Sequence, residues 1–309
     1  MDHIGKGIEH TFKKRGFSKK FDDLMEEALR DPDVQLFINN NREQLTDEDI
    51  VRSYSKLYEF VQEKKKFESN NHTMLAPGYQ PALFINHHYI DVTYMPTERL
   101  IEERKAAEVR NRVKAMDMPK DIREARLDRF EMTNERKEAF SEAIQFVNQY
   151  ESNPKGFHKG LYLQGTFGVG KTYLLGAIAN ALAEKGFSTT LVHFPTLAVE
   201  MKQAIGKDNL GDKVDSIKNA PILMLDDIGA DSMSSWVRDD ILGVILQYRM
   251  QEQLPTFFSS NFNMAQLENE HLRYSQRGED EPLKAKRIME RVRYLSKEIN
   301  MIGQNRRQG

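Results

Sequence analysis

Apolar and polar positions change their spacing along the chain, and the changes divide it into three stretches. In residues 1–67 apolar residues recur at helical spacing, and Asp31-Pro32-Asp33 punctuates the first pattern. A second helical pattern starts near Thr46, where Thr46 to Asp49 resembles a helix N-terminus. Two β-rich runs, 83–85 and 89–94, then flank Asn86-His87-His88 like a hairpin. Residues 1–96 are therefore predicted to form a small, helix-rich α+β N-terminal domain. The apolar faces of the two helical patterns are Phe21, Leu24, Met25, Ala28 and Leu29, and Ile50, Tyr54, Leu57, Tyr58 and Val61.

Residues 97–133 are dense in Glu, Arg and Lys and carry few aromatic residues. Charges of both signs at helical spacing are typical of a solvated helix, so we expect a charged helical linker. Met118-Pro119-Lys120 is expected to interrupt it, because proline lacks the N–H that a helix interior needs. The segment is either a simple connector or a lever between two working domains.

From residue 134 short apolar runs alternate with helical patterns, which is typical of a parallel sheet covered by helices on both faces. Residues 134–309 are therefore predicted to form one α/β domain. Strands are expected over 161–163, 189–194, 221–225, 256–261 and 298–302, and helices over 135–150, 173–185, 197–205, 234–252 and 283–295.

Composition narrows the setting in which the protein works. No apolar run approaches the ~20 residues of a membrane span, and no apolar segment of a signal peptide follows Met1. We therefore expect a cytoplasmic protein without membrane contact. The chain has no cysteine, which excludes disulfides and thiolate zinc sites. The net charge of −2 means that any contact with DNA depends on local patches.

Residues 165–172 match the pattern G-x-x-x-x-G-K-[ST], between an expected strand and an expected helix. Glycines let backbone N–H groups curl around phosphate oxygens, and the helix N-terminus faces the same phosphates. Lys171 would reach the β- and γ-phosphates, and the Thr172 hydroxyl would bind Mg²⁺. The competing interpretation is a glycine-rich turn that binds nothing. The predicted ATP-binding residues here are Gly165, Thr166, Phe167, Gly168, Val169, Gly170, Lys171, Thr172 and Tyr173.

Acidic and amide side chains end two later apolar strands. Asp226 and Asp227 follow the apolar run 222–225, and Asn261 ends the run 257–260. Ligands of open α/β sheets lie at this edge, so Asp226 is the candidate Mg²⁺ ligand and Asp227 the residue that orients or deprotonates water. Asn261 is the candidate γ-phosphate or water contact. The alternative interpretation is that Asp226 and Asp227 only cap a turn, and that Asn261 only begins one.

Basic and aromatic residues outside these motifs support weaker expectations. Arg291 shares a helical segment with Arg287 and Arg293, so one of them could act as an arginine finger on a neighbouring subunit, or all three form a solvated face. His193, Phe194 and Lys202 are candidate contacts for single-stranded DNA. The stronger interpretation is that Phe194 packs in the core and that Lys202 is solvated. Lys13-Lys14-Arg15 with Lys19-Lys20 is a second basic cluster, expected to be solvated.

Several phrases together resemble bacterial helicase loaders of the DnaI/DnaC type, which are AAA+ ATPases. In the front part the phrases are Asp31-Pro32-Asp33-Val34 and Gly78-Tyr79-Gln80-Pro81. In the ATPase part they are residues 160–172, 222–229, 236–239, 254–262 and 287–292. The front part separates such loaders from transposon-encoded ATPases that share the core.

The resemblance implies a role for each matching residue. Residues 165–172 correspond to Walker A, Asp226 to the Walker B Mg²⁺ ligand, and Asp227 to the catalytic Glu of many AAA+ proteins. Asn261 corresponds to sensor 1, Arg291 to the arginine finger and Arg307, more weakly, to a sensor 2 arginine. The N-terminal domain would engage a hexameric DnaB-type replicative helicase. The AAA+ domain would bind ATP and single-stranded DNA, and the loader would self-associate through Arg291. Other primosome or initiator proteins would be further partners.

Two departures from the family pattern change the expected behaviour. The related N-terminal domains commonly carry a cysteine zinc site, and this chain offers only His72, His87 and His88, so zinc is not expected. Asp227 stands where many AAA+ proteins have Glu, and the shorter side chain favours slow hydrolysis, hence a weak Mg-dependent ATPase that works as a switch. The rival hypotheses are a transposition-helper ATPase and an adapter that binds ATP without turnover.

Overall fold

The structure is a computed structural model that describes residues 19–116, 118–206, 209–230, 233–274 and 278–306. It falls into two compact units that divide between Ala106 and Ala107. Each unit is considered by itself.

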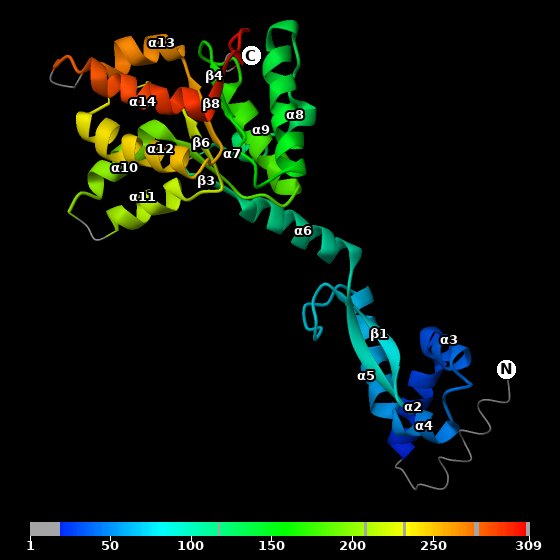
Figure 1. The fold of residues 1–309 in the computed structure, drawn as a ribbon. Helices are drawn as coiled ribbons and strands as arrows, with labels where there is room; N and C mark the ends of the chain where they lie inside the picture. The colour runs from blue at the N-terminus through cyan, green and yellow to red at the C-terminus, as the bar shows by residue number, and fades with distance from the viewer. Residues whose placement is uncertain (1–18, 117, 207–208, 231–232, 275–277, 307–309) are drawn as a thin grey trace. The chain divides into compact units, whose positions relative to one another are not determined.

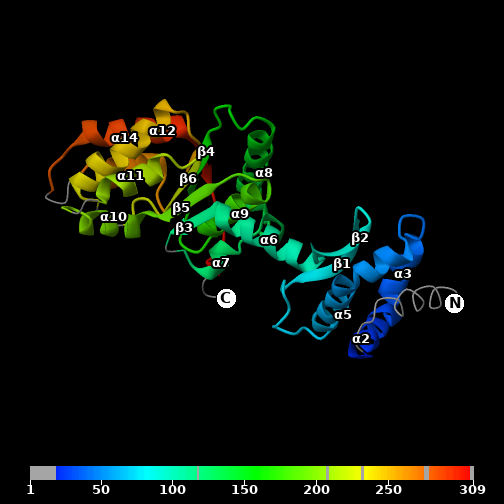
Figure 2. The same cartoon turned by 90° about the horizontal axis from the view of Figure 1, so that it is seen from below.

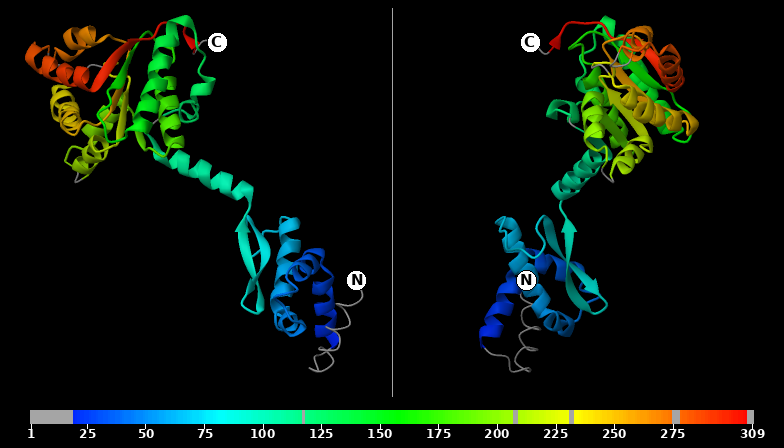
Figure 3. Two further views of the ribbon diagram at one scale, coloured as in Figure 1. Left: turned by 45° about the vertical axis from the view of Figure 1, so that its right-hand side comes forward. Right: turned by 90° about the vertical axis from the view of Figure 1, so that its left-hand side faces the viewer.

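The first unit packs helices against a two-stranded antiparallel hairpin. The hairpin pairs β1 with β2 and turns at His87 and His88, as the sequence predicts. The helix α5 lies beside it (Figure 3). Met25, Ile50, Leu57 and Ile90 are among the buried residues that form this core. The elements are α2 (Lys19–Arg30), α3 (Pro32–Asn40), α4 (Asp47–Arg52), α5 (Tyr54–Glu68), β1 (Tyr79–Asn86) and β2 (Tyr89–Pro96). The helix α6 (Glu98–Arg112) contains the boundary between the two units.

Side-chain caps explain where these helices begin. The Asp31 carboxylate accepts hydrogen bonds from the N–H groups of Asp33 and Val34, so this residue caps the start of α3. Thr46 and Asp49 form a capping box at the start of α4, which confirms the predicted helix start. The helical pattern expected to continue from Thr46 is broken at Ser53, whose buried hydroxyl donates to Asp49 O and accepts the Ile90 N–H. This serine therefore ties the helices to the hairpin.

Glu63 fixes the segment between α5 and β1. Its carboxylate is 3% exposed, accepts the Leu75 N–H at 2.7 Å, and pairs with Lys66 Nζ at 2.7 Å. Burial raises the pKa of Glu63, but the hydrogen bonds from Lys66 and Leu75 outweigh it and hold the pKa below the ordinary value of 4.5. The stability that Glu63 contributes is thus complete above about pH 4.5 and is lost as the pH falls through the lowered pKa.

We expect Glu63→Ala to destabilise the first unit by about 1–3 kcal/mol, because it leaves the Leu75 N–H and the Lys66 ammonium without their acceptor. Hydrogen exchange followed by mass spectrometry on the full chain measures this as faster exchange in peptides from α5 and residues 69–78. Glu68→Ala, at an exposed position on the same helix, is the control and should exchange as the parent does. Equal exchange in both variants would contradict the role given to Glu63.

The second unit is built on a six-stranded sheet with the order β3-β5-β6-β7-β4-β8, and every paired strand is parallel to its neighbour (Figures 1 and 2). The strands are β3 (Val113–Met116), β4 (Gly160–Gln164), β5 (Thr189–His193), β6 (Ile222–Asp226), β7 (Thr256–Ser260) and β8 (Ser296–Asn300). The α-helices are α7 (Lys120–Arg123), α8 (Lys137–Ser152), α9 (Lys171–Glu184), α10 (Phe194–Gln203), α11 (Leu210–Lys218), α12 (Gly243–Gln251), α13 (Met264–Gln266) and α14 (Pro282–Leu295). Short 3₁₀ turns η1 (Leu127–Arg129) and η2 (Asn134–Arg136) and π-helical turns η3 (Val237–Leu242) and η4 (Leu267–Leu272) complete it.

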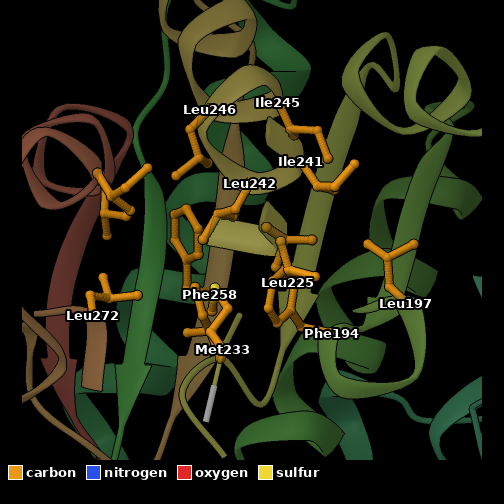
Figure 4. Close-up of a cluster of buried hydrophobic side chains, with 14 of the residues drawn as sticks. Phe194, Leu197, Leu225, Met233, Ile241, Leu242, Ile245, Leu246, Phe258 and Leu272 are labelled. Carbon is orange, nitrogen blue, oxygen red and sulfur yellow. The ribbon is translucent and has the colours of Figure 1, made fainter. Parts of the chain in front are cut away.

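Helices cover both faces of the sheet. Side chains alternate between the two faces along each strand, so one strand can contribute to both buried clusters. In β6, Leu223 and Leu225 belong to one buried cluster, and Ile222 and Met224 belong to another. The first cluster joins the sheet to α10, η3, α12 and α14 (Figure 4), and the second joins it to α8 and α9. The predicted α/β fold with a helical N-terminal domain is confirmed.

The charged helix expected after residue 97, with an interruption at Met118-Pro119-Lys120, ends earlier, at Arg112, and the chain continues as β3. Four residues with a lysine among them give no alternation that a sequence pattern can detect, and hydrogen bonding to β5 forms the strand. At the other edge of the sheet, α14 ends at Leu295 and β8 begins at Ser296 without an intervening loop.

Candidate nucleotide site

The P-loop follows β4 directly and leads into α9. Gly168 and Gly170 have φ values of 76° and 95°, a left-handed backbone that other residues rarely adopt. Gly170 is the N-cap of α9, so the first N–H groups of that helix face the loop. Val169 is buried in the core, which anchors the middle of the loop, and Phe167 is 65% exposed at its tip.

Lys171 lies inside this loop and is 7% exposed. Its Nζ donates to Gly165 O at 2.7 Å, Thr166 O at 3.0 Å and Asn261 Oδ1 at 2.8 Å. The predicted P-loop lysine and the predicted sensor, which directly follows β7, are therefore brought together. An ammonium carried on the first residue of a helix is suited to a polyphosphate, because the helix N-terminus also favours negative charge.

Asp226 is 3% exposed and lies beside Thr172. The Thr172 hydroxyl donates to Asp226 Oδ1 at 2.9 Å, and the Ser259 hydroxyl donates to the same oxygen. Burial raises the pKa of Asp226, and the hydrogen bonds from Ser259 and Thr172 oppose that shift. Hydroxyl and carboxylate oxygens at this spacing fit Mg²⁺, which prefers hard oxygen ligands.

Asp227 begins the loop after β6 in an unusual backbone conformation, with φ of 62°. Such strain in a residue with a side chain is found most often at functional sites. The Asp227 N–H donates to Ser259 Oγ at 2.9 Å, and Asn261 Nδ2 donates to Asp227 Oδ1 at 3.3 Å. His193 Nε2 lies 3.9 Å from Asp227 Oδ2, so this histidine faces the predicted catalytic acid.

A cavity of about 1020 Å³ joins these groups. Lys171, Thr172, Asp226, Asp227 and Asn261 line it. Tyr173 also lines it, on a wall shared with Met118, Ile122 and Phe130. The cavity thus has a charged end beside the strand edges and an apolar end near the start of α9, which matches the two halves of a nucleotide.

Arg291 lies away from this cavity, on α14. It is half-buried, and its Nη1 donates to Gly243 O at 2.9 Å. Burial lowers the pKa of Arg291, and the neighbouring Arg287 lowers it further. Arg287 is exposed, and Arg293 pairs with Glu268.

Arg307 lies outside the described residues. Its neighbour Arg306 lines the cavity, pairs with Glu131, and donates its backbone N–H to Gly168 O at 3.1 Å. The segment after β8 therefore lies against the P-loop.

The residues predicted to contact DNA differ in their exposure. Phe194 is 3% exposed and packs in the core (Figure 4), so its ring cannot stack on a base. Lys202 is exposed on α10, and His193 is half-buried. Residues 13–15 lie outside the described part of the chain, as do the side chains of Lys19 and Lys20.

Sequence reasoning missed Ser259, Arg136 and Arg306 as site residues. A serine pair in an otherwise apolar strand is the signal that could have identified Ser259. Arg136, in the turn before α8, lines the cavity although nothing in its sequence context marks it.

Within the described ranges, no group of three or more His, Asp or Glu side chains is arranged to hold a metal ion. Among the helices that are described, none has the length and apolar character needed to cross a membrane.

Two families match the chain. Residues 1–94 match the family described as primosomal protein DnaI N-terminus, and residues 91–304 match the family described as IstB-like ATP binding protein. The second match places an ATP-binding domain over the cavity described above.

Relatives with known names agree with these matches. The replicative helicase loader DnaI of Bacillus subtilis (strain 168) is 40% identical over 314 residues, which cover 99% of each chain. A crystal structure of DnaI is 46% identical, covers 64% of this chain and 99% of its own, and superimposes with a TM-score of 0.55. A solved structure from Streptococcus pyogenes serotype M3 is also 46% identical, covering 65% of this chain and 98% of its own, with a TM-score of 0.54. The chain therefore belongs to the DnaI family of replicative helicase loaders, whose ATP-binding domain is of the AAA+ type.

Proposed function

We propose that this helicase loader is a weak Mg-dependent ATPase that uses nucleotide as a switch. The observation that carries the proposal is the meeting of three strand ends beside the P-loop. There Thr172 contacts Asp226, and Asn261 contacts both Lys171 and Asp227. These contacts bring the groups that bind phosphate next to the groups that act on water.

Each residue has a distinct task in this proposal. Thr172 and Asp226 would hold Mg²⁺, which would neutralise phosphate charge. Lys171 leaves the carbonyl groups of Gly165 and Thr166 and contacts the phosphates. Asn261 and Asp227 orient the attacking water, and the short Asp227 side chain keeps hydrolysis slow.

The proposed partner is a hexameric DnaB-type replicative helicase, which the protein delivers onto single-stranded DNA during primosome assembly with other primosome or initiator proteins. Docking belongs to the N-terminal domain, for which we propose residues 1–96, with a linker over 97–133 and the ATPase domain over 134–309. The match of residues 1–94 to the DnaI N-terminus supports this division of labour. A transposition-helper ATPase would need no such domain, and an adapter without turnover would not need Asp227 and Asn261.

Gel filtration with the host's DnaB-type helicase tests the proposal. The full chain and a fragment of residues 1–106 are each mixed with helicase, with and without ATP. Co-elution of the fragment supports docking by the N-terminal domain. Co-elution of the full chain only with ATP would move docking to the ATPase domain. No complex under any condition would overturn the proposed partner.

We expect Arg291→Ala to lower ATP hydrolysis by at least about 10³-fold, the typical contribution of an arginine finger. Because Arg291 does not line its own cavity, it would act on the nucleotide of a neighbouring subunit. Mixing Arg291→Ala with Lys171→Ala should then restore part of the activity, because the second variant supplies the arginine to the first. Phosphate release in the mixture measures this.

Arg293→Ala is the control, since this arginine pairs with Glu268 within its own chain. Its hydrolysis should stay close to that of the parent. Failure of the mixture to recover any activity would argue against action between subunits.

A further inference from the structure

Arg136 is a buried cation that is poorly satisfied by its own protein. It is 2% exposed, and its Nη1 donates to Glu131 O at 2.7 Å. Its Nε is buried without a hydrogen-bond partner, and among the described residues no carboxylate lies within 4.0 Å of the guanidinium. A buried charge in this state costs free energy unless a counter-ion reaches it.

The other two fully buried arginines of the described chain are satisfied. Arg238 pairs with the carboxylates of Asp239 and Glu281. Arg249 donates to the Thr256 hydroxyl and to three backbone carbonyl oxygens. The fold therefore provides acceptors where a buried arginine is structural, and Arg136 is the exception.

Arg136 lies at the nucleotide cavity. Its Nη2 is so close to Gly170 that a Cβ built on that glycine would lie 2.3 Å away. The guanidinium is centred 4.0 Å over the ring of Phe130, which fixes its plane. Arg306 adds a second positive charge, and burial together with that charge lowers the pKa of Arg136. Guanidinium groups stay protonated in proteins, so the charge persists.

Lys171 and Arg136 contact different residues of the site. Lys171 Nζ contacts Asn261, which in turn donates to Asp227, the residue proposed to orient water. Arg136 lies against Gly170 and Phe130, toward the apolar end of the cavity. A nucleotide seated with its γ-phosphate near Asn261 would bring the phosphates next to the ribose toward Arg136.

We propose that Arg136 is a nucleotide-binding residue whose guanidinium binds the phosphates nearest the ribose. Its planar fork matches two phosphate oxygens, and the phosphate is a counter-ion in direct contact, whereas the Glu131 carboxylate favours the charge only from a greater distance. The inference rests on ATP binding at the P-loop, and it predicts a contribution that is equal for ATP and ADP, because both carry these phosphates.

Isothermal titration calorimetry of the full chain with ATP and with ADP, in the presence of Mg²⁺, tests the proposal. Arg136→Ala should weaken both nucleotides by about 10- to 100-fold, the effect of losing hydrogen bonds to a charged group. Arg136→Lys, which keeps the charge and loses the fork, should lie between Arg136→Ala and the parent. Arg123→Ala is the matched control, because Arg123 is an exposed arginine on α7 that does not line the cavity, and its effect should be about threefold or less.

Thermal unfolding without nucleotide shows whether each variant is folded. If Arg136→Ala does not fold, Arg136→Lys is the variant that decides. Unchanged affinity in the folded variant overturns the proposal. Tighter binding also overturns it, because the side chain would then obstruct the cavity. Lys171→Ala separates the two hypotheses: if it binds ATP as the parent does, the P-loop assignment itself fails. If it loses binding while Arg136→Ala does not, only the inference about Arg136 fails.

Discussion

Asp226→Asn should lower ATP hydrolysis by at least about 100-fold while the folded structure is retained. The amide keeps the size of the carboxylate and can still accept the Thr172 hydroxyl, but it removes the charge that would hold Mg²⁺. Steady-state phosphate release at saturating ATP and Mg²⁺ measures the loss. Asp240→Asn, at an exposed position in η3, is the control and should hydrolyse ATP as the parent does.

The same variant has a second expected result in the absence of nucleotide. Burial raises the pKa of Asp226 above that of the unfolded chain, so ionising this side chain costs folding stability. The cost grows as the pH rises from the unfolded pKa through the folded one and is complete above it. Asp226→Asn removes this cost, and its melting temperature at neutral pH should equal or exceed that of the parent. A large fall in melting temperature would mean that the residue is chiefly structural.

Arg238→Met should destabilise the second unit by about 3–5 kcal/mol, the usual effect of breaking a buried ion pair. Arg238 is 1% exposed, donates to Leu272 O, and pairs with Asp239 and Glu281. The paired Asp239 carboxylate raises the pKa of Arg238 against the opposing effect of burial. One side chain thus joins η3, the end of η4 and the start of α14.

Urea unfolding followed by tryptophan fluorescence measures this loss. Trp236 is the only tryptophan of the chain, so the signal reports on the second unit alone. Arg273→Met is the matched control, because Arg273 also forms a two-pronged pair with a carboxylate, that of Asp280, but at the surface. It should change the transition little. Similar midpoints for the two variants would show that burial of the Arg238 pair adds nothing.

The sequence was sufficient to predict the charged end of the site. Asp226 and Asn261 end apolar strands, and the carboxyl ends of parallel strands meet at the same sheet edge, so pattern alone brings them to the P-loop. The hairpin in the first unit was predictable for a similar reason, because two β-rich runs flank a short polar turn.

The rest of the site depends on contacts between distant segments. Arg136 reaches Gly170, and Arg306 reaches Glu131 across 175 positions, and neither contact leaves a mark in local spacing. The strand β3 was missed because hydrogen bonds to β5, rather than its own residues, define it. Packing therefore decides which arginines line the cavity, whereas strand ends decide where the acids lie.

The direct passage from α14 into β8 has a mechanical consequence. β8 pairs in parallel with β4 over Gly160–Gln164, and β4 runs straight into the P-loop. Because no loop separates Leu295 from Ser296, no flexible segment would absorb a rotation of α14 before it reached β8. A neighbouring subunit that displaced Arg291 on α14 would move β8. Because β8 pairs with β4, the displacement would reach the backbone of the P-loop. In such an assembly, contact with a neighbouring subunit and binding of nucleotide would be mechanically coupled through the continuous segment of α14 and β8.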